Sequence, residues 1–312
     1  VGAADGAHGP GGPTRALRLH GDDLPPLPPT WWQHAVVYSI FVDRFRNSAQ
    51  PSRAALLATG ERSRFGGDLE GIRQALPYLQ DLGVTVLHLT PLATSDSAHR
   101  YDAKNPMCVD PALGGEAALR KLLDDAHARG LRVIGDLVHT HVHRDFLPFC
   151  DVRARGHASP FASWFHLLRH PFFDGGEGEH GAPDPGYAHY QKGQWQEPLL
   201  RHEHPEVIDY LCRVLQHQLA LGFDGLRIDP ASDAPRSLLG RLRQAAGPHA
   251  LLLGEVTTDN IARFIDAGLH AATDFAHARA LCDWLAPTPA VGGDAPSQPT
   301  AADTARAWAQ AD

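Results

Sequence analysis

Two acidic side chains stand at the ends of strongly apolar segments, where buried strands would bring them to one edge of a sheet. Asp229 ends the segment GLRID, and Glu255 follows the segment LLLG. Because residues two apart on a strand share a face, we expect Arg227 beside Asp229, where its charge lowers the pKa of that carboxyl. Partial burial raises the pKa of Glu255 instead. An ionised nucleophile and a protonated general acid about 5–5.5 Å apart are the arrangement that cleaves a glycosidic bond with retention.

Either acidic residue alone could have a purely structural role. Acidic residues at strand ends often cap the following helix or pair with a nearby arginine. The combination is more specific, because twenty-six residues separate Asp229 from Glu255, which fits one strand–helix–strand step. We therefore take both as candidate catalytic residues.

The segments around these residues predict the fold. From Trp31 onward, short apolar runs alternate with helical patterns, which indicates repeated βα units and a parallel sheet. We expect strands at 36–42, 85–89, 132–137, 225–228, 251–255 and 272–275. We expect helices at 69–82, 115–129, 205–221, 235–246 and 258–267. This pattern predicts an α/β fold of the (β/α)8 TIM-barrel type, of which about six strands are present.

The connection after the third expected strand is long. Ninety-three residues separate Asp136 from Asp229, and the excess is rich in histidine, glycine, proline and aromatic residues. A long aperiodic connection at this point predicts an inserted subdomain at about 142–200, on the edge where barrel enzymes bind their substrates. The Gly- and Pro-rich residues 1–30 predict a leader or linker, and 31–312 the partial barrel.

Composition excludes several classes of protein. No segment approaches the roughly 18 apolar residues of a membrane helix, so we expect no membrane partner. The formal net charge of −8 argues against a nucleic-acid partner. Four scattered cysteines indicate neither a disulfide framework nor a zinc ribbon. The cellular location is open, with the cytoplasm favoured because no signal-peptide pattern is visible, and nothing indicates the oligomeric state.

Three ordered segments resemble the motifs of the α-amylase family (glycoside hydrolase family 13), whose catalytic domain is a (β/α)8 barrel acting on α-glucans. The segment DLVHTH at 136–141 is similar to the first motif of the family, D-x-V-x-N-H. GLRID at 225–229 resembles the second motif, and GEV at 254–256 the third. Further similar stretches are VYSIFVDRF at 37–45, FGGDLEGI at 65–72 and HRYD at 99–102. The resemblance extends from about Trp31 to Phe275.

This resemblance implies a retaining α-glycosidase that acts on α-glucans or malto-oligosaccharides by double displacement. Asp229 would be the nucleophile that forms the glycosyl–enzyme intermediate. Glu255 would protonate the leaving oxygen and then activate water or an acceptor sugar. Arg227 would hold Asp229 ionised and oriented.

The resemblance also implies the substrate-binding residues. His141 and His99 would form hydrogen bonds with hydroxyl groups of the sugar at the cleavage site, and Tyr101 would stack against its ring. An aromatic ring suits a sugar because the C–H faces of the sugar are apolar.

The sequence departs from the family pattern at several positions. Thr140 replaces the usual Asn, a frequent calcium ligand, and the oxygen ligands between Asn47 and Asp68 are sparse, so we expect no cofactor and calcium is only weakly supported. The segment EPLLR at 197–201 follows the x-P-D-L-N motif only loosely. A fourth motif, whose His–Asp pair supplies a third carboxylate, would lie past Asp312. The sequence is therefore expected to be C-terminally incomplete and, by itself, inactive.

Three alternatives stay open. The pattern formed by His139, His141 and His143 is typical of a metal-dependent hydrolase, although 20 histidines in the chain make such clusters common. An α-glucosyltransferase of the same family would use the same residues, with hydrolysis favoured over transfer. A glycan-binding or degenerate barrel without the third carboxylate would not be an enzyme.

Overall fold

The computed structural model describes residues 27–49, 64–172, 185–191, 194–258 and 260–285. Within them the strands are β1 (Val37–Ile40), β2 (Val86–Leu89), β3 (Arg132–Val138), β4 (Gly225–Asp229), β5 (Leu251–Gly254) and β6 (Ala271–Ala272). The α-helices are α1 (Val42–Phe45), α2 (Leu69–Asp81), α3 (Gly115–Ala128), α4 (Leu147–Arg155), α5 (Pro205–Leu221), α6 (Arg236–Ala246), α7 (Ile261–Ile265) and α8 (Phe275–Leu285). Short 3-10 helices span Thr30–His34, Pro111–Leu113, Gly156–Ala158, Ala162–Trp164 and Ala231–Asp233.

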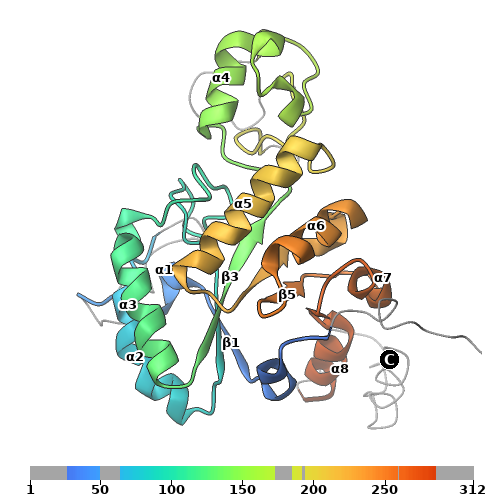
Figure 1. Cartoon of the computed structure of the whole chain (residues 1–312). Helices are drawn as coiled ribbons and strands as arrows, with labels where there is room; N and C mark the ends of the chain where they lie inside the picture. The colour runs from blue at the N-terminus through green and yellow to red at the C-terminus, as the bar shows by residue number, and fades with distance from the viewer. Residues whose placement is uncertain (1–26, 50–63, 173–184, 192–193, 259, 286–312) are drawn as a thin grey trace, which may run out of the picture.

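The six strands form one parallel sheet in the order β1-β2-β3-β4-β5-β6. Each strand pairs with the next along the chain, and helices cover one face of the sheet (Figure 1). This arrangement confirms the prediction of a partial (β/α)8 barrel. No helix in the described part of the chain has the length and apolar character needed to cross a membrane.

Alternation along the strands gives the sheet two different faces. One face packs against the helices in the main hydrophobic core, to which the strands contribute Leu87, Leu89, Val133, Leu137, Leu226, Ile228 and Leu252. The other face carries a smaller apolar cluster that includes Ile134. Because side chains on a strand alternate, Asp136 continues the face of Ile134 toward the carboxyl end of β3. Arg227 and Asp229 share one face of β4, and Arg227 pairs with Asp136 in the strand register.

The predicted insertion after β3 stands above the carboxyl ends of the strands (Figure 1). Its described part contains α4 and a small aromatic cluster around Phe149. The ring of Phe149 lies 4.8 Å from those of Phe165 and Tyr187, centre to centre, and 6.1 Å from that of Phe172. Buried aromatic area of this kind stabilises a segment that has little regular secondary structure.

Several elements differ from the predictions, among them the sixth strand, which spans Ala271–Ala272 and not 272–275. The first strand is shorter than expected, because the chain turns into α1 at Val42. Helix α8 was not predicted, since its apolar residues, such as Leu281 and Trp284, stay exposed and therefore show no pattern of a buried face. Most of the predicted leader and the region after Leu285 lie outside the described residues.

Candidate active site

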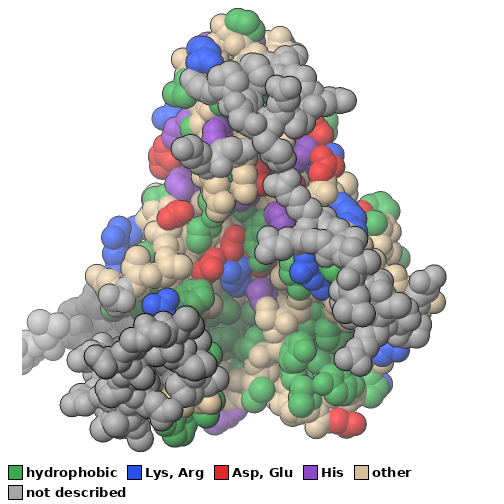
Figure 2. Space-filling model, turned by 180° about the vertical axis from the view of Figure 1, so that it is seen from behind, with side chains coloured by type: hydrophobic (Ala, Val, Ile, Leu, Met, Phe, Trp, Pro, Cys, Tyr) green, Lys and Arg blue, Asp and Glu red, His purple; other side chains and the backbone are tan. Residues whose placement is uncertain are grey.

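One guanidinium holds three carboxylates together at the carboxyl ends of the strands. Arg227 Nη1 lies 2.8 Å from Asp229 Oδ1 and 2.9 Å from both carboxylate oxygens of Asp136. Arg227 Nη2 lies 2.8 Å from Glu255 Oε2. Figure 2 shows a hollow in which acidic and basic side chains gather above hydrophobic ones. The structure thus brings together Asp229, Glu255 and Arg227, as the sequence predicts.

The strands position these groups through close backbone contact. A Cβ atom at Gly225 would lie only 2.4 Å from the carbonyl oxygen of Leu251, so glycine allows β4 and β5 to pair at this point. Past β5, the amide of Glu255 donates a hydrogen bond to the carbonyl of Ile228 at 3.0 Å. Glu255 therefore lies next to the end of β4, where Asp229 stands.

Asp136 is a further member of the site that sequence analysis did not assign. Its side chain is completely buried, and the hydroxyl of Tyr101 donates a hydrogen bond to its Oδ2 at 3.0 Å. His88 Nε2 lies 3.3 Å from the same oxygen, while its Nδ1 is 2.9 Å from the hydroxyl of Ser39. A buried carboxylate requires such partners. Asp136 therefore anchors Arg227 from below instead of facing a substrate.

Arg227 lowers the pKa of Asp229 as expected, but the net shift of that pKa is upward. Burial raises the pKa of Asp229, and the hydrogen bond with Glu255 and the charge of Asp136 raise it further, against the lowering effect of Arg227. The main reason is burial of the Asp229 carboxyl, and the single guanidinium, which also binds Asp136 and Glu255, does not offset it. A retaining mechanism needs one proton on its two carboxyl groups, and Arg227 holds both of these groups side by side.

The loop that carries His99 and Tyr101 has an unusual backbone conformation at Arg100, the residue between them. Arg100 has a φ of 62°, in the left-handed region that favours glycine, and the family motif has glycine there. The guanidinium of Arg100 is buried and binds Asp110 Oδ2 at 3.1 Å, which holds this conformation. Tyr101 thereby reaches Asp136, and the ring of His99 lies 5.8 Å from that of Tyr101. Their roles toward a sugar stay predictions.

His141 lies under a tyrosine from the insertion. The ring of Tyr190 stacks on that of His141 at 4.2 Å between ring centres, and only a few per cent of His141 is exposed. The hydroxyl of Thr140 lies 2.8 Å from Nδ1 of His141. Burial lowers the pKa of His141 to about 4, so its ring is neutral at neutral pH. Its predicted contact with a sugar must therefore use the remaining nitrogen, Nε2.

Glu197 brings a fourth carboxyl group close to this region. Its side chain is 12% exposed, and its Oε2 lies 3.9 Å from Nε2 of His141. Burial raises the pKa of Glu197 to about 7, and the charge of Asp102 adds to this effect. The loose match of EPLLR to the family motif gave no indication of this position.

The raised pKa of Glu197 predicts a pH-dependent stability. In the unfolded chain the pKa is near the ordinary 4.5, so folding favours the protonated form. This contribution is complete below about pH 4.5 and is lost as the pH rises through about 7. We expect the wild type to lose up to about 3 kcal/mol of unfolding free energy relative to Glu197→Gln between about pH 5 and 8. Urea unfolding of both proteins at several pH values measures the difference.

A matched control is Glu203→Gln. The side chain of Glu203 is 48% exposed and its pKa is lowered, so it does not titrate in this range. The buried histidines are present in every variant, and their contributions cancel in the comparison. A stability difference between wild type and Glu197→Gln that stays constant with pH would contradict the prediction.

Residues 39–239, well over half of the chain, match the family described as "Alpha amylase, catalytic domain". The chain belongs to the α-amylase family. The match includes Asp136, Arg227 and Asp229 but ends before Glu255, whose assignment rests on its position at Arg227.

Relatives of this α-amylase family chain include two curated proteins. Neopullulanase 2 of Thermoactinomyces vulgaris is 35% identical over 241 residues, which cover 74% of this chain and 40% of that protein. A cyclomaltodextrinase of Thermoanaerobacter pseudethanolicus is 33% identical over 240 residues, which cover 74% of this chain and 41% of that protein. The chain thus spans about two fifths of the length of these relatives.

A solved structure from the family has the same fold. It is the cyclic α-maltosyl-(1→6)-maltose hydrolase from Arthrobacter globiformis in complex with that sugar, with a TM-score of 0.77. The superposition covers 91% of this chain and 62% of the hydrolase, at 23% sequence identity.

The three histidines of the H-x-H-x-H pattern do not converge on one point. His139 bonds to His202 and to the carbonyl of Pro230, while His141 lies against Thr140. Only His143 belongs to a group that could hold a metal ion among the described residues, together with Asp96 and Asp145. The ammonium of Lys104 already binds both carboxylates of that group, at 2.6 and 3.2 Å. The pattern therefore does not form the metal centre of a barrel hydrolase.

The two residues considered for a calcium loop have other partners in this α-amylase family chain. Asp68 caps α2, where Oδ1 accepts a hydrogen bond from the Gly71 amide at 2.6 Å, and Oδ2 accepts one from the Ser48 hydroxyl. Asn47 Oδ1 accepts a hydrogen bond from the amide of Ala49 at 2.8 Å. These oxygens serve the local backbone, as is usual at a helix start and in a turn.

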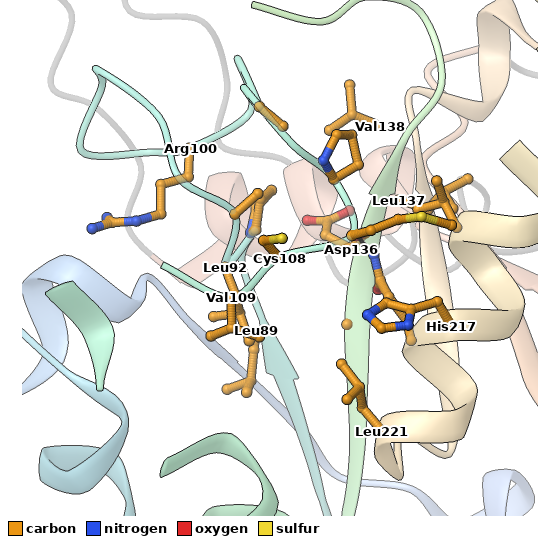
Figure 3. Close-up of a pocket in the computed structure, with 18 of the residues that line it drawn as sticks. Leu89, Leu92, Arg100, Cys108, Val109, Asp136, Leu137, Val138, His217 and Leu221 are labelled. Carbon is orange, nitrogen blue, oxygen red and sulfur yellow. Dashed lines mark hydrogen bonds between the residues drawn. The ribbon is translucent and has the colours of Figure 1, made fainter. Parts of the chain in front are cut away.

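A mostly apolar cavity of about 50 Å³ borders Asp136, the buried carboxylate that binds Arg227. Figure 3 shows Asp136 between Leu92 and Cys108 on one side and His217 and Leu221 of α5 on the other. The carboxylate of Asp136 therefore has few polar neighbours toward the cavity. Its charge depends on the hydrogen bonds and the guanidinium described above.

Proposed function

We propose that this chain carries the catalytic centre of a retaining α-glucan hydrolase. The observation that supports the proposal is the pair formed by Asp229 and Glu255 on two nitrogens of one guanidinium. Carboxylates that share one guanidinium suit the short carboxyl separation of retaining enzymes, about 5–5.5 Å. The pair suits direct attack on the anomeric carbon by one carboxylate.

The proposed reaction has two steps, in which Glu255 first gives away a proton and then takes one up. In the first step an Asp229 oxygen bonds to the anomeric carbon, while the glycosidic bond breaks and Glu255 gives its proton to the leaving oxygen. In the second step Glu255 takes a proton from water, and the oxygen of that water displaces Asp229 from the sugar. Two inversions at the anomeric carbon give net retention. Arg227 stays in contact with both carboxylates and limits their movement.

The proposed substrates are α-linked glucose chains, such as malto-oligosaccharides, cyclodextrins and pullulan. The support is the family membership together with the names of relatives, a neopullulanase and a cyclomaltodextrinase. Those names are also the reason for favouring hydrolysis over transfer to another sugar.

The stereochemistry of the product tests the proposal. We expect the complete gene product to release the α-anomer first from maltotriose or a cyclodextrin, because double displacement retains configuration. Proton NMR during the first minutes resolves the anomers before mutarotation mixes them. Release of the β-anomer would contradict the geometry, and binding without cleavage would indicate a glycan-binding barrel. A release of glucose polymers longer than the substrate would indicate a transferase.

A further inference from the structure

Glu197 is a buried carboxyl group outside the Arg227 cluster. Its backbone is fixed on both sides, because its amide donates to Gln194 and its carbonyl accepts from the amide of Tyr190, both at 3.0 Å. Its side chain is 12% exposed, and among the described residues none forms a hydrogen bond with its carboxyl. Burial of an unpaired carboxyl costs free energy, so packing alone does not explain a glutamate here.

The distance from Glu197 to His141 leaves space for one atom. Oε2 of Glu197 and Nε2 of His141 are 3.9 Å apart, which is too long for a direct hydrogen bond. One oxygen placed about 2.8 Å from each of them would complete two hydrogen bonds, with an angle of about 90° at that oxygen. The gap therefore fits a single bridging oxygen.

The hydrogen bonds around His141 determine what kind of oxygen this is. We assign the buried Thr140 hydroxyl as the donor to Nδ1 of His141, 2.8 Å away, which places the proton of the neutral ring on Nε2. Nε2–H donates into the gap, and the Glu197 carboxylate accepts from it. Only a group that accepts and donates at one atom fits between them, which is the property of water or of a sugar hydroxyl that displaces it, and which excludes an ammonium.

The gap lies beside the two candidate catalytic carboxylates. Tyr190 stacks on His141, and Glu197 accepts the amide hydrogen bond of Tyr190. In the strand register Val138 of β3 pairs with Asp229 of β4, so His141, three residues after Val138, lies just beyond the strand ends that carry the candidate catalytic residues. A sugar bound between Asp229 and Glu255 would therefore meet this gap.

We infer that Glu197 is a substrate-binding residue whose carboxylate accepts a hydrogen bond from the same sugar hydroxyl that accepts one from His141. The inference rests on the proposed function and names one further contact within that site. A hydroxyl group held by a donor and a charged acceptor is recognised strongly, because its removal leaves two buried polar groups unpaired.

Monodeoxy substrates test the inference in the complete gene product. The probes are 4-nitrophenyl α-maltosides that lack one hydroxyl at a time on the glucose next to nitrophenol. We expect one of these deletions to lower the kcat/KM of the wild type by roughly 10- to 100-fold. In Glu197→Leu the parent maltoside should lose activity by a similar factor, and the same deletion should then cost less than about 3-fold. Glu197→Gln, which keeps an uncharged acceptor, should lie between the two.

Controls separate substrate binding from a structural role. Glu203→Leu replaces an exposed glutamate nearby and should keep every deletion penalty at its wild-type value. Thermal unfolding of Glu197→Leu should show no loss of stability, because leucine removes an unpaired buried carboxyl. Two results would overturn the inference and leave the proposed function intact. One is that every deletion lowers kcat/KM in Glu197→Leu by the same factor as in the wild type. The other is that kcat/KM falls equally for all probes and the melting temperature is lowered. If the wild type cleaves none of the maltosides, both are overturned.

Discussion

Asp229→Asn is expected to lower the kcat for α-glucans by at least about 10⁴-fold, because an amide oxygen cannot form the glycosyl–enzyme intermediate. The substitution keeps the shape of the side chain and an oxygen acceptor for Arg227 Nη1, which lies 2.8 Å from Asp229 Oδ1. The fold should therefore remain. Initial rates on maltotriose and a cyclodextrin, with circular dichroism spectra of both proteins, measure the two effects.

The control for this variant is Asp209→Asn. Asp209 of α5 forms an exposed ion pair with Arg241 of α6 at 2.7 Å, and its loss should leave kcat within about 2-fold of the wild type. Near-normal activity of Asp229→Asn would show that another group attacks the sugar. An unfolded Asp229→Asn protein would instead assign the residue a structural role. In that case Asp229→Gly with added azide tests whether Asp229 is the nucleophile. If Asp229 is the nucleophile, that variant should form the β-glycosyl azide.

Glu255→Gln is expected to lower the kcat for natural glucans by about 10²- to 10⁴-fold, the usual contribution of a general acid. The loss should depend on the leaving group. A glycosyl fluoride or a dinitrophenyl glycoside leaves without a proton, so the first step should fall much less with these substrates. Comparing the ratio of rates for maltotriose and for a maltosyl fluoride in wild type and variant measures this difference.

Azide provides the independent check on Glu255. In Glu255→Ala the missing base slows hydrolysis of the intermediate, and azide, which needs no base, should restore turnover and give the α-glycosyl azide. An equal loss of activity for all leaving groups, with no response to azide, would contradict the acid–base role. The opposite anomers expected from the Asp229 and Glu255 variants distinguish the two residues from each other.

Local patterns in the sequence are sufficient to predict the strand ends and the neighbourhood of Arg227 and Asp229. Each strand is an apolar run, and the two-residue period of a strand puts both side chains on one face. The proximity of Glu255 to Asp229 follows from their spacing of one βα unit. These features depend on short stretches of chain, and the structure confirms the fold that they predict.

The ionisation of Asp229 could not be predicted in the same way. Its direction depends first on burial in the assembled barrel and then on neighbouring carboxylates, one of which, Asp136, lies 91 residues before Arg227 and shares its guanidinium. The strand register that aligns Asp136 with Arg227 is a property of the assembled sheet. A local pair of charges in the sequence therefore gave the wrong sign.

The periodic pattern of the sequence gave no indication that Glu197 and Tyr190 belong to the site. They lie in an irregular segment that an isolated bridge between His141 and Leu199 joins to the end of β3 and that another bridge, His189 with Pro198, closes internally. Such pairings join distant parts of the chain without a repeating pattern of side chains. Only the folded insertion brings the ring of Tyr190 onto His141.

The order of the strands also matters while the protein is being synthesised. Since each described strand pairs with its predecessor, the ribosome delivers them in the order in which they join. Asp136 emerges on β3 long before the guanidinium that neutralises it, and an uncompensated buried charge would cost about 3–5 kcal/mol. A nascent chain without β4 must therefore leave the end of its third strand hydrated. Docking of the fourth strand brings Arg227 and Asp229 to Asp136, and Glu255 joins them only when the fifth strand has paired with the fourth.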